Sequence, residues 1–329
     1  MKKLAILLGI LLLVSMSVFA AGQAEATGAA KAFVPTKNIE WYVTSSPGGG
    51  SDIFTRTIMD IAVAENLLNG QNVVVQYKTD GAGEVGRLLV SQIKAGVQAD
   101  HTLLTFNSGD LMPMVKNTAN RFENFQHIAH MAVDKHLLFI GEYSKYKSFE
   151  EVLAALKRGE RIVLGGSKGD DIGCHAALIK EIGVTEDQFS YIAHDATSGA
   201  ITAILGGHFD LLISKPAAAS QYVEAGKIKP ILALSTSRFP GNLNSAPTLS
   251  EFGYKNVEVP NWRSIVAPKS MSAEAVAYWT DVFKKVSETE NWNKGYIEKQ
   301  KLVPDYMDSE TFRTYGMQFQ KDYLASIGK

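Results

Sequence analysis

Hydrophobic and polar positions along the chain follow two periods from residue 39 onward. Short apolar and β-branched runs predict eight strands, over residues 39–44, 72–77, 102–106, 136–140, 161–164, 189–193, 209–213 and 230–234. Between them, apolar residues at helical spacing predict six helices, over residues 52–66, 85–94, 149–157, 172–182, 199–205 and 217–224. Strands that alternate with helices of this length favour parallel α/β sheets.

The C-terminal part of the chain has a different pattern. Residues 273–287, 291–300 and 309–325 are predicted to be helical, with no strand between them. We expect these helices to pack back on the first sheet. One helix start is marked individually, because Ser148 followed by Glu151 has the spacing of a capping box and predicts a helix from Phe149.

The N-terminus resembles a secretory signal peptide. Lys2 and Lys3 precede an apolar run over residues 4–14, and small residues then lead to a cleavage position after Ala20. We therefore predict a signal peptide over residues 1–20 and a small-residue tether over 21–35; the alternative is an uncleaved membrane anchor. No cysteine lies near the cleavage position, which argues against a lipid anchor. The expected location is the periplasm.

Composition narrows the classes of function. The 329 residues are 46% apolar and 20% charged, which is typical of a globular protein, and their number suggests two domains or one large one. With 33 Lys plus Arg against 34 Asp plus Glu, the formal net charge is −1, so nucleic acid is not an expected partner. The single cysteine, Cys174, excludes an intramolecular disulfide and a cysteine-based zinc site, and we predict that it packs in the core.

Glycine-rich loops provide the candidate chemistry. Four loops each follow a predicted strand and precede a predicted helix, at residues 45–52, 79–83, 165–169 and 195–199. Glycine lets the backbone approach a ligand closely, and a helix start presents unpaired N–H groups with partial positive charge. In open α/β sheets, ligands bind outside the carboxyl ends of the strands, where these loops should lie. The pattern therefore favours an anion-binding site.

Two loops also fit other motifs. Residues 81–86 match G-x-G-x-x-G, but export argues against a nicotinamide cofactor, and we predict none. Residues 165–169 match G-x-S-x-G, so a secreted serine hydrolase with Ser167 as nucleophile is an alternative. Asp195 and His208 would have to complete its triad. His127 and His130 lack the partners of a metal motif and are expected to be structural, so no metal is predicted.

In their order along the chain, several motifs resemble the substrate-binding proteins of tripartite tricarboxylate transporters, the Bug-type receptors. The first is Pro47-Gly48-Gly49-Gly50-Ser51-Asp52 with Arg56, and the second is Gly81-Ala82-Gly83 with Gly86. Further matches are residues 100–104, 206–210, 226–228, 232–234, Arg238, 247–253, Trp262 and 267–269. The resemblance covers essentially all of the chain after the signal peptide.

This resemblance implies a two-lobed α/β periplasmic binding protein of type II, a Venus flytrap with parallel-sheet lobes and C-terminal helices. Lobe 1 would comprise residues 36–136 plus 236–329, and lobe 2 residues 137–235, with crossings near Lys135–Leu138 and Leu234–Arg238. The resemblance implies no enzymatic activity. A monomer would capture a small organic anion, a mono-, di- or tricarboxylate, and deliver it to the membrane permease subunits. A periplasmic carboxylate sensor or adaptor is a second alternative.

The resemblance also implies the ligand-binding positions. They are Gly49, Gly50, Ser51, Asp52, Gly81, Ala82, Gly83, Asn107 and Ser108 in lobe 1, and Ser167, Gly169, Thr197 and Ser198 in lobe 2. Lys215 follows a predicted strand and is a candidate cation for a second acidic group of the ligand. Glu84 departs from the family pattern, in which glycine is usual, and a carboxylate there would repel an anion unless it points away.

Overall fold

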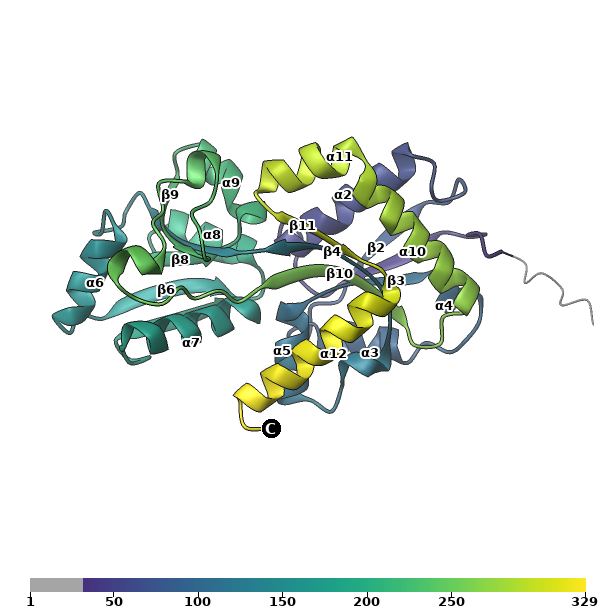
Figure 1. Ribbon diagram of the computed structural model, residues 1–329, viewed down its shortest axis with the longest axis horizontal. Helices are drawn as coiled ribbons and strands as arrows, with labels where there is room; N and C mark the ends of the chain where they lie inside the picture. The colour runs from purple at the N-terminus through teal and green to yellow at the C-terminus, as the bar shows by residue number, and fades with distance from the viewer. Residues whose placement is uncertain (1–31) are drawn as a thin grey trace, which may run out of the picture. The chain divides into compact units, whose positions relative to one another are not determined.

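The structure is a computed structural model that describes residues 32–329 (Figure 1). The predicted signal peptide and residues 21–31 of the predicted tether lie outside the described residues. Among the helices described, none combines the length and the apolar character needed to cross a membrane.

Six strands form the first sheet. Their order is β11 (Val303–Met307), β4 (Phe125–Asp134), β10 (Asn261–Pro268), β3 (Thr102–Asn107), β1 (Ile39–Val43) and β2 (Val73–Tyr77). The strand β1 runs parallel to β2 and β3, whereas β10 is antiparallel to β3 and β4, and β11 is antiparallel to β4. The predicted parallel sheet is therefore wrong for this half, because three strands that the pattern did not show make it mixed.

Five strands form the second sheet, and all five were predicted. Their order is β7 (Phe189–His194), β6 (Ile162–Ser167), β8 (Leu211–Ser214), β5 (His136–Gly141) and β9 (Ile228–Leu234). The strand β6 is parallel to β7 and β8, but β5 is antiparallel to β8 and β9, so this sheet is also mixed. Only Lys135 separates β4 of the first sheet from β5 of the second.

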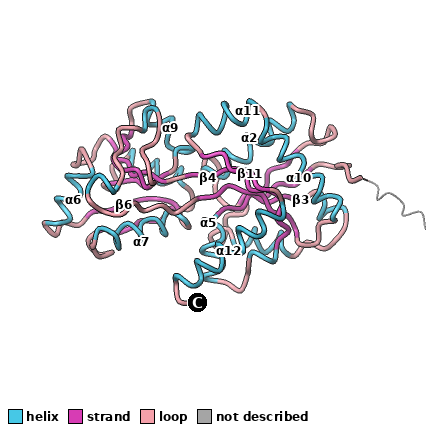
Figure 2. The backbone as a smooth tube through the Cα atoms, in the orientation of Figure 1, coloured by secondary structure: helices cyan, strands magenta, loops and turns pink. Residues whose placement is uncertain are grey.

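Helices cover the sheets and connect their strands (Figure 2). They are α2 (Gly50–Ala64), α3 (Glu84–Ser91), α4 (Val97–Asp100), α5 (Ser108–Asn117), α6 (Phe149–Lys157), α7 (Asp170–Ile182), α8 (Thr197–Leu205), α9 (Pro216–Glu224), α10 (Ala273–Glu288), α11 (Glu290–Trp292) and α12 (Ser309–Ser326). A π-helical turn, Asn293–Glu298, continues α11. As the capping-box spacing predicts, α6 begins at Phe149, and Ser148 Oγ accepts a hydrogen bond from the Glu151 N–H.

The C-terminal region contains a strand that the pattern missed. The edge strand β11 lies between α11 and α12, so the predicted absence of a strand there is wrong. Its residues include Pro304 and Asp305, and a proline and a charge at a sheet edge hide the alternation that a buried strand would show.

The second sheet has a core on each face because side chains alternate along a strand. In β5, Leu138 packs on one side with Phe149 and Leu178, whereas Phe139 packs on the other with Ile201. Leu243, Ala246 and Leu249 belong to these same two clusters. The chain therefore stays with the second sheet after β9 and enters the first sheet again only at Asn261, later than the predicted return near Leu234–Arg238.

In the first sheet, His127 lies in an aromatic cluster with Phe122 and Phe312, and its Nε2 donates to the Phe122 carbonyl. Burial lowers the pKa of His127 to about 4. Since the unfolded chain binds this proton near pH 6.5, the contribution of His127 to stability is present above pH 6.5 and is lost as the pH falls toward 4. The loss should reach about 3 kcal/mol.

Thermal unfolding between pH 7 and pH 4 checks this prediction. The His127→Phe variant should show a smaller fall in Tm over that range than the parent protein. An equal fall in both proteins would contradict it.

Candidate functional site

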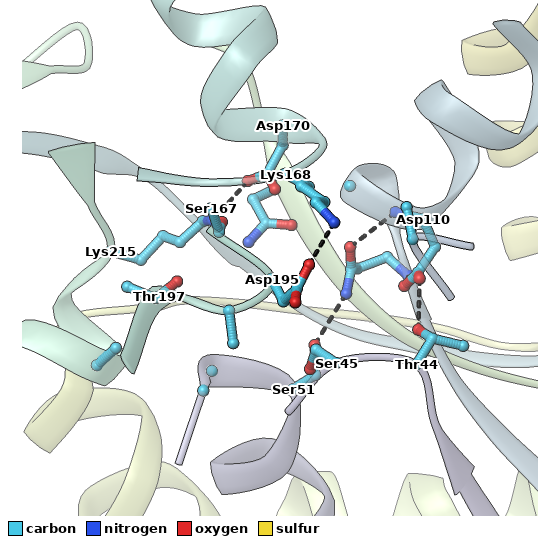
Figure 3. A pocket seen from close by; sticks show the side chains of 18 of the residues that line it. Thr44, Ser45, Ser51, Asp110, Ser167, Lys168, Asp170, Asp195, Thr197 and Lys215 are labelled. Carbon is cyan, nitrogen blue, oxygen red and sulfur yellow. Dashed lines mark hydrogen bonds and ion pairs between the residues drawn. The ribbon is translucent and has the colours of Figure 1, made fainter. Parts of the chain in front are cut away.

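A cavity of about 70 Å³ lies where loops from both sheets meet (Figure 3). Its walls are the segments that follow β1, β2 and β3 on one side and β6, β7 and β8 on the other, and β10 contributes Asn261 and Arg263. Eight predicted ligand-binding residues line it: Gly49, Gly50, Ser51, Ala82, Asn107, Ser167, Thr197 and Lys215. The carboxyl ends of strands thus meet at one place, as the sequence predicts.

The remaining six predicted residues, Asp52, Gly81, Gly83, Ser108, Gly169 and Ser198, do not line the cavity. Asp52 accepts hydrogen bonds from the Gly48 N–H at 2.8 Å and from Arg56 and Tyr77, so it fixes the start of α2. Ser108 Oγ donates to the Pro260 carbonyl at 3.0 Å. These two polar side chains support the walls of the cavity.

The start of α2 is an open donor site. Gly49 precedes the helix and no side chain caps it, so the first N–H groups of α2 are left for another acceptor. By contrast, α5 has a complete capping box, in which Asn107 Oδ1 accepts from the Asp110 N–H and Asp110 Oδ2 accepts from the Asn107 N–H. Asn107 Nδ2 also donates to Ser51 Oγ at 3.1 Å, which ties the two helix starts together.

Glu84 does not face the cavity. Its carboxylate pairs with Arg87 at 2.8 Å and accepts a hydrogen bond from Asn120 at 3.1 Å. The same arginine pairs with Asp110 at 2.8 Å, and Asp110 also accepts from Thr44 Oγ1. Burial raises the pKa of Asp110, although Arg87 opposes this effect. Glu84 therefore points away from the cavity and is neutralised by Arg87, so it does not repel an anion there. The sequence pattern did not reveal this partner.

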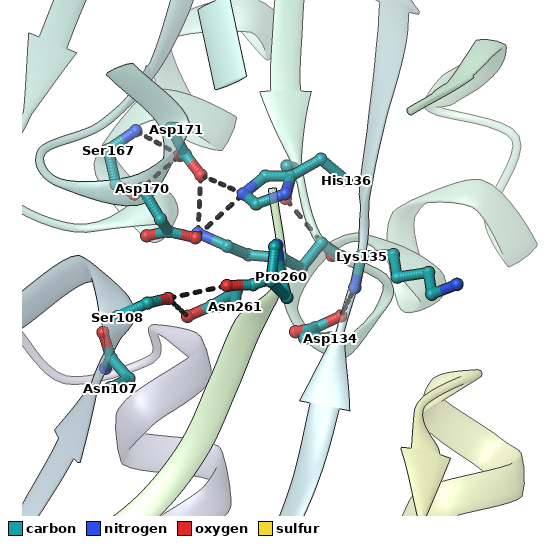
Figure 4. Close-up of polar contacts among 12 residues, drawn as sticks. Asn107, Ser108, Asp134, Lys135, His136, Ser167, Asp170, Asp171, Pro260 and Asn261 are labelled. Carbon is teal, nitrogen blue, oxygen red and sulfur yellow. Dashed lines mark hydrogen bonds and ion pairs between the residues drawn. The ribbon is translucent and has the colours of Figure 1, made fainter. Parts of the chain in front are cut away.

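On the other side, four buried groups form one ionic cluster (Figure 4). His136 Nε2 lies 2.8 Å from Asp170 and 3.0 Å from Asp171, and Lys215 Nζ lies 2.9 Å and 2.5 Å from the same two carboxylates. Ser167 donates from both its N–H and its Oγ to Asp171. Asp170 and Lys215 both line the cavity. The Lys215 ammonium is paired with the carboxylates of Asp170 and Asp171.

Charge pairing sets the protonation states in this cluster. Burial would raise the pKa of Asp170, but Lys215 and His136 outweigh it and hold the pKa below its usual range. Burial would lower the pKa of His136, but Cys174 and the two carboxylates outweigh it and hold the pKa well above its usual range. At neutral pH the cluster therefore contains two carboxylates and two cations.

The cluster does not fit a metal ion. The ligand atoms of His136, Asp170 and Asp171 are close enough together to hold one. However, the Lys215 ammonium already lies against both carboxylates, and a protonated imidazole is not a metal ligand.

Ser167 also lacks the arrangement of a nucleophile. Its Oγ bonds to Asp171, and His136 bonds to the other oxygen of the same carboxylate. A serine triad needs the histidine between the serine and the carboxylate. His208, the base that the hydrolase alternative required, is exposed and does not line the cavity.

Arg263 is a cavity residue that the sequence analysis missed. It is 2% exposed and pairs with Asp134 at 2.5 Å. A Cβ at Gly50 would lie 2.5 Å from Arg263 Nη2, so any larger residue there would displace the guanidinium from the start of α2. The sequence shows an arginine directly after Trp262, but the polar residues Asn261 and Ser264 on either side of this pair hide the strand, and nothing in the pattern placed it beside the glycine loops.

Contacts join the two sides of the cavity. Ser198 Oγ, which follows β7, donates across the cavity to the Pro47 carbonyl, which follows β1, at 3.3 Å. Gly109 and Gly169 are packed backbone to backbone, because a Cβ at Gly169 would lie 2.4 Å from the Gly109 carbonyl oxygen.

Comparison with known proteins places the chain in a family. Residues 57–328 match the model of the tripartite tricarboxylate transporter family receptor. A UPF0065 protein of Cupriavidus necator is 28% identical over 302 residues, which cover 90% of this chain and 88% of that protein.

Solved structures share the fold. The periplasmic binding protein BugD has a TM-score of 0.77 at 20% identity, over 88% of this chain and 96% of that one. MatC of Rhodopseudomonas palustris with bound malate has a TM-score of 0.76 at 16% identity, over 89% and 98%. A second R. palustris protein, with adipate, has a TM-score of 0.76 at 17% identity, over 89% and 98%. The type II periplasmic-binding fold and the family match agree: this chain belongs to the tripartite tricarboxylate transporter receptor family and is a solute-binding protein.

Proposed function

We propose that this protein is a periplasmic receptor that captures a small organic carboxylate between its two sheets and delivers it to the membrane permease of a tripartite transporter. One observation carries the proposal, namely that the uncapped start of α2 and the buried Arg263 face one cavity. Both features stabilise an anion. The malate and adipate bound by the two structural relatives support this ligand class.

In this proposal each sheet with its helices is a lobe, and ligand binding favours the form in which the lobes meet. The first crossing is Lys135, and the second is the segment that leads into β10. A ligand shifts such an equilibrium only by binding one form better than the other, and a cavity with walls from both lobes has that property.

A melting assay with a panel of mono-, di- and tricarboxylates tests the proposal. A ligand at 100 times its Kd adds about 2.7 kcal/mol to the free energy of unfolding, which should raise the Tm by several degrees. Amines and neutral sugars are the controls and should leave the Tm unchanged. If no carboxylate raised the Tm and no anion co-purified with the protein, the proposal would be wrong.

A further inference from the structure

Arg263 has more donors than partners. A guanidinium carries five N–H groups, and the hydrogen bond found for it among the described residues joins Nη2 to Asp134. Its Nε is buried without a partner in the part of the chain that the structure describes. The hydrogen bonds found among the described residues do not include one from Nη1 either. An unpaired donor in a protein interior is costly, so Nη1 of this cavity-lining side chain calls for an acceptor from a ligand.

The surroundings show where that acceptor binds. The guanidinium packs against Gly50, the first residue of α2. The guanidinium of Arg263 and the unpaired N–H groups at the start of α2 therefore lie close together, and one acceptor group can bind to both. A planar carboxylate is an acceptor that fits a guanidinium fork.

The other charges around the cavity are already matched. The ionisable groups of its wall and their ion-pair partners comprise five carboxylates, Asp110, Asp134, Asp170, Asp171 and Asp195, and five cations, Arg87, His136, Lys168, Lys215 and Arg263. Arg87 has a second carboxylate partner in Glu84. This set has no unmatched cation to receive a second negative charge. On the wall opposite α2, the cations Lys168 and Lys215 are already paired with Asp195, Asp170 and Asp171, so they are not free to bind a second carboxylate.

From these contacts we infer that the cavity selects a small monocarboxylate, bound by Arg263 and the start of α2, over di- and tricarboxylates. The inference rests on the proposed function and narrows its ligand class. The cavity volume of about 70 Å³ agrees with a small ligand, since roughly 10–15 Å³ of such space holds one water molecule.

Titration calorimetry with matched pairs of acids tests the selection: propionate and malonate, butyrate and succinate, 2-hydroxybutyrate and malate, and benzoate and phthalate. In the pairs that bind, we expect the monocarboxylate to bind roughly tenfold or more tightly than its dicarboxylate. A dicarboxylate that bound as tightly as its partner would overturn this inference and leave the proposed function standing. If no acid of any class bound, both would be overturned.

Variants test the role of Arg263. Because Arg263→Gln alone would leave Asp134 buried without a partner, the test uses the double variant Arg263→Gln with Asp134→Asn. It should bind the preferred monocarboxylate roughly 10- to 100-fold more weakly and should lose the preference over the dicarboxylate. The Arg263→Lys variant keeps the positive charge beside Asp134 but lacks the paired N–H donors of the guanidinium, so it should also bind the monocarboxylate more weakly. It replaces the double variant as the test if that variant does not fold. The exposed Arg313→Gln is the matched control. Unchanged affinity in both Arg263 variants would overturn the assignment.

Discussion

Replacing Lys215 with methionine should lower the free energy of unfolding by about 3–5 kcal/mol, because the change breaks a buried ion pair. Lys215 is 5% exposed and lies between Asp170 and Asp171. Without the ammonium, two buried carboxylates share only His136, and one negative charge loses its partner. Chemical denaturation at pH 7 measures the loss.

The pH dependence separates this cause from a simple packing defect. In the parent protein the pKa of Asp170 lies below its usual range, so its pairing stabilises the fold at neutral pH and is lost as the pH falls. In Lys215→Met a carboxylate should take up a proton more easily, and the deficit relative to the parent should shrink between pH 7 and pH 5. Adding Asp170→Asn should recover part of the stability. The exposed Lys285→Met is the control, with an expected change within about 0.5 kcal/mol. A deficit that did not change with pH would contradict the ionic explanation.

Gly109→Ala should weaken ligand binding by roughly 5- to 150-fold while leaving the unliganded protein folded. A Cβ at Gly109 would lie 2.4 Å from Asp170 Oδ1, on the opposite side of the cavity, and 2.9 Å from Asn107 Oδ1. The contact between α5 and α7 would then have to open. Gly109 lies within α5, where alanine is the better helix former, so the helix itself should tolerate the change.

The control for Gly109→Ala lies on the facing helix. A Cβ at Gly173 in α7 would meet Met112 at 3.7 Å, an ordinary contact, so Gly173→Ala should bind as the parent does. Calorimetry with the acid that most raises the Tm in the panel gives the affinities, and small-angle scattering gives the dimensions with and without it. Equal affinity in Gly109→Ala and the parent would show that this contact does not belong to the liganded form.

The parts of the fold that the sequence predicted are those with local signals. The capping spacing at Ser148 predicted the start of α6, and the glycine loops predicted which strand ends meet. The strand β10 was not predicted, because its first four residues include buried Asn261, Arg263 and Ser264. Polar residues in a strand interior hide the apolar pattern by which a buried strand is recognised. The strand β4 was not predicted for the same reason, since the polar residues His127 and His130 lie buried within it.

The candidate site shows a similar limit. Helix starts can be predicted from neighbouring residues, so the helix start at Gly49 and Gly50 could be predicted from the sequence, while its role as a donor to a ligand stays a prediction. Ion pairs such as Arg263 with Asp134 join residues 129 positions apart, and only the sheet order brings them together. The helix start at the cavity could therefore be predicted from the sequence, but the ion pairs among the charged side chains of the cavity could not be predicted without the sheet topology.

The single residue between β4 and β5 has a consequence for substitutions beside it. Its two neighbours, Asp134 and His136, belong to the same ion pairs that hold Arg263 and Asp170 at the cavity wall. A rotation about Lys135 would carry one of these charges with each sheet. If the proposed function holds, a substitution at Asp134 or His136 should therefore alter the cavity wall and the hinge at Lys135 together.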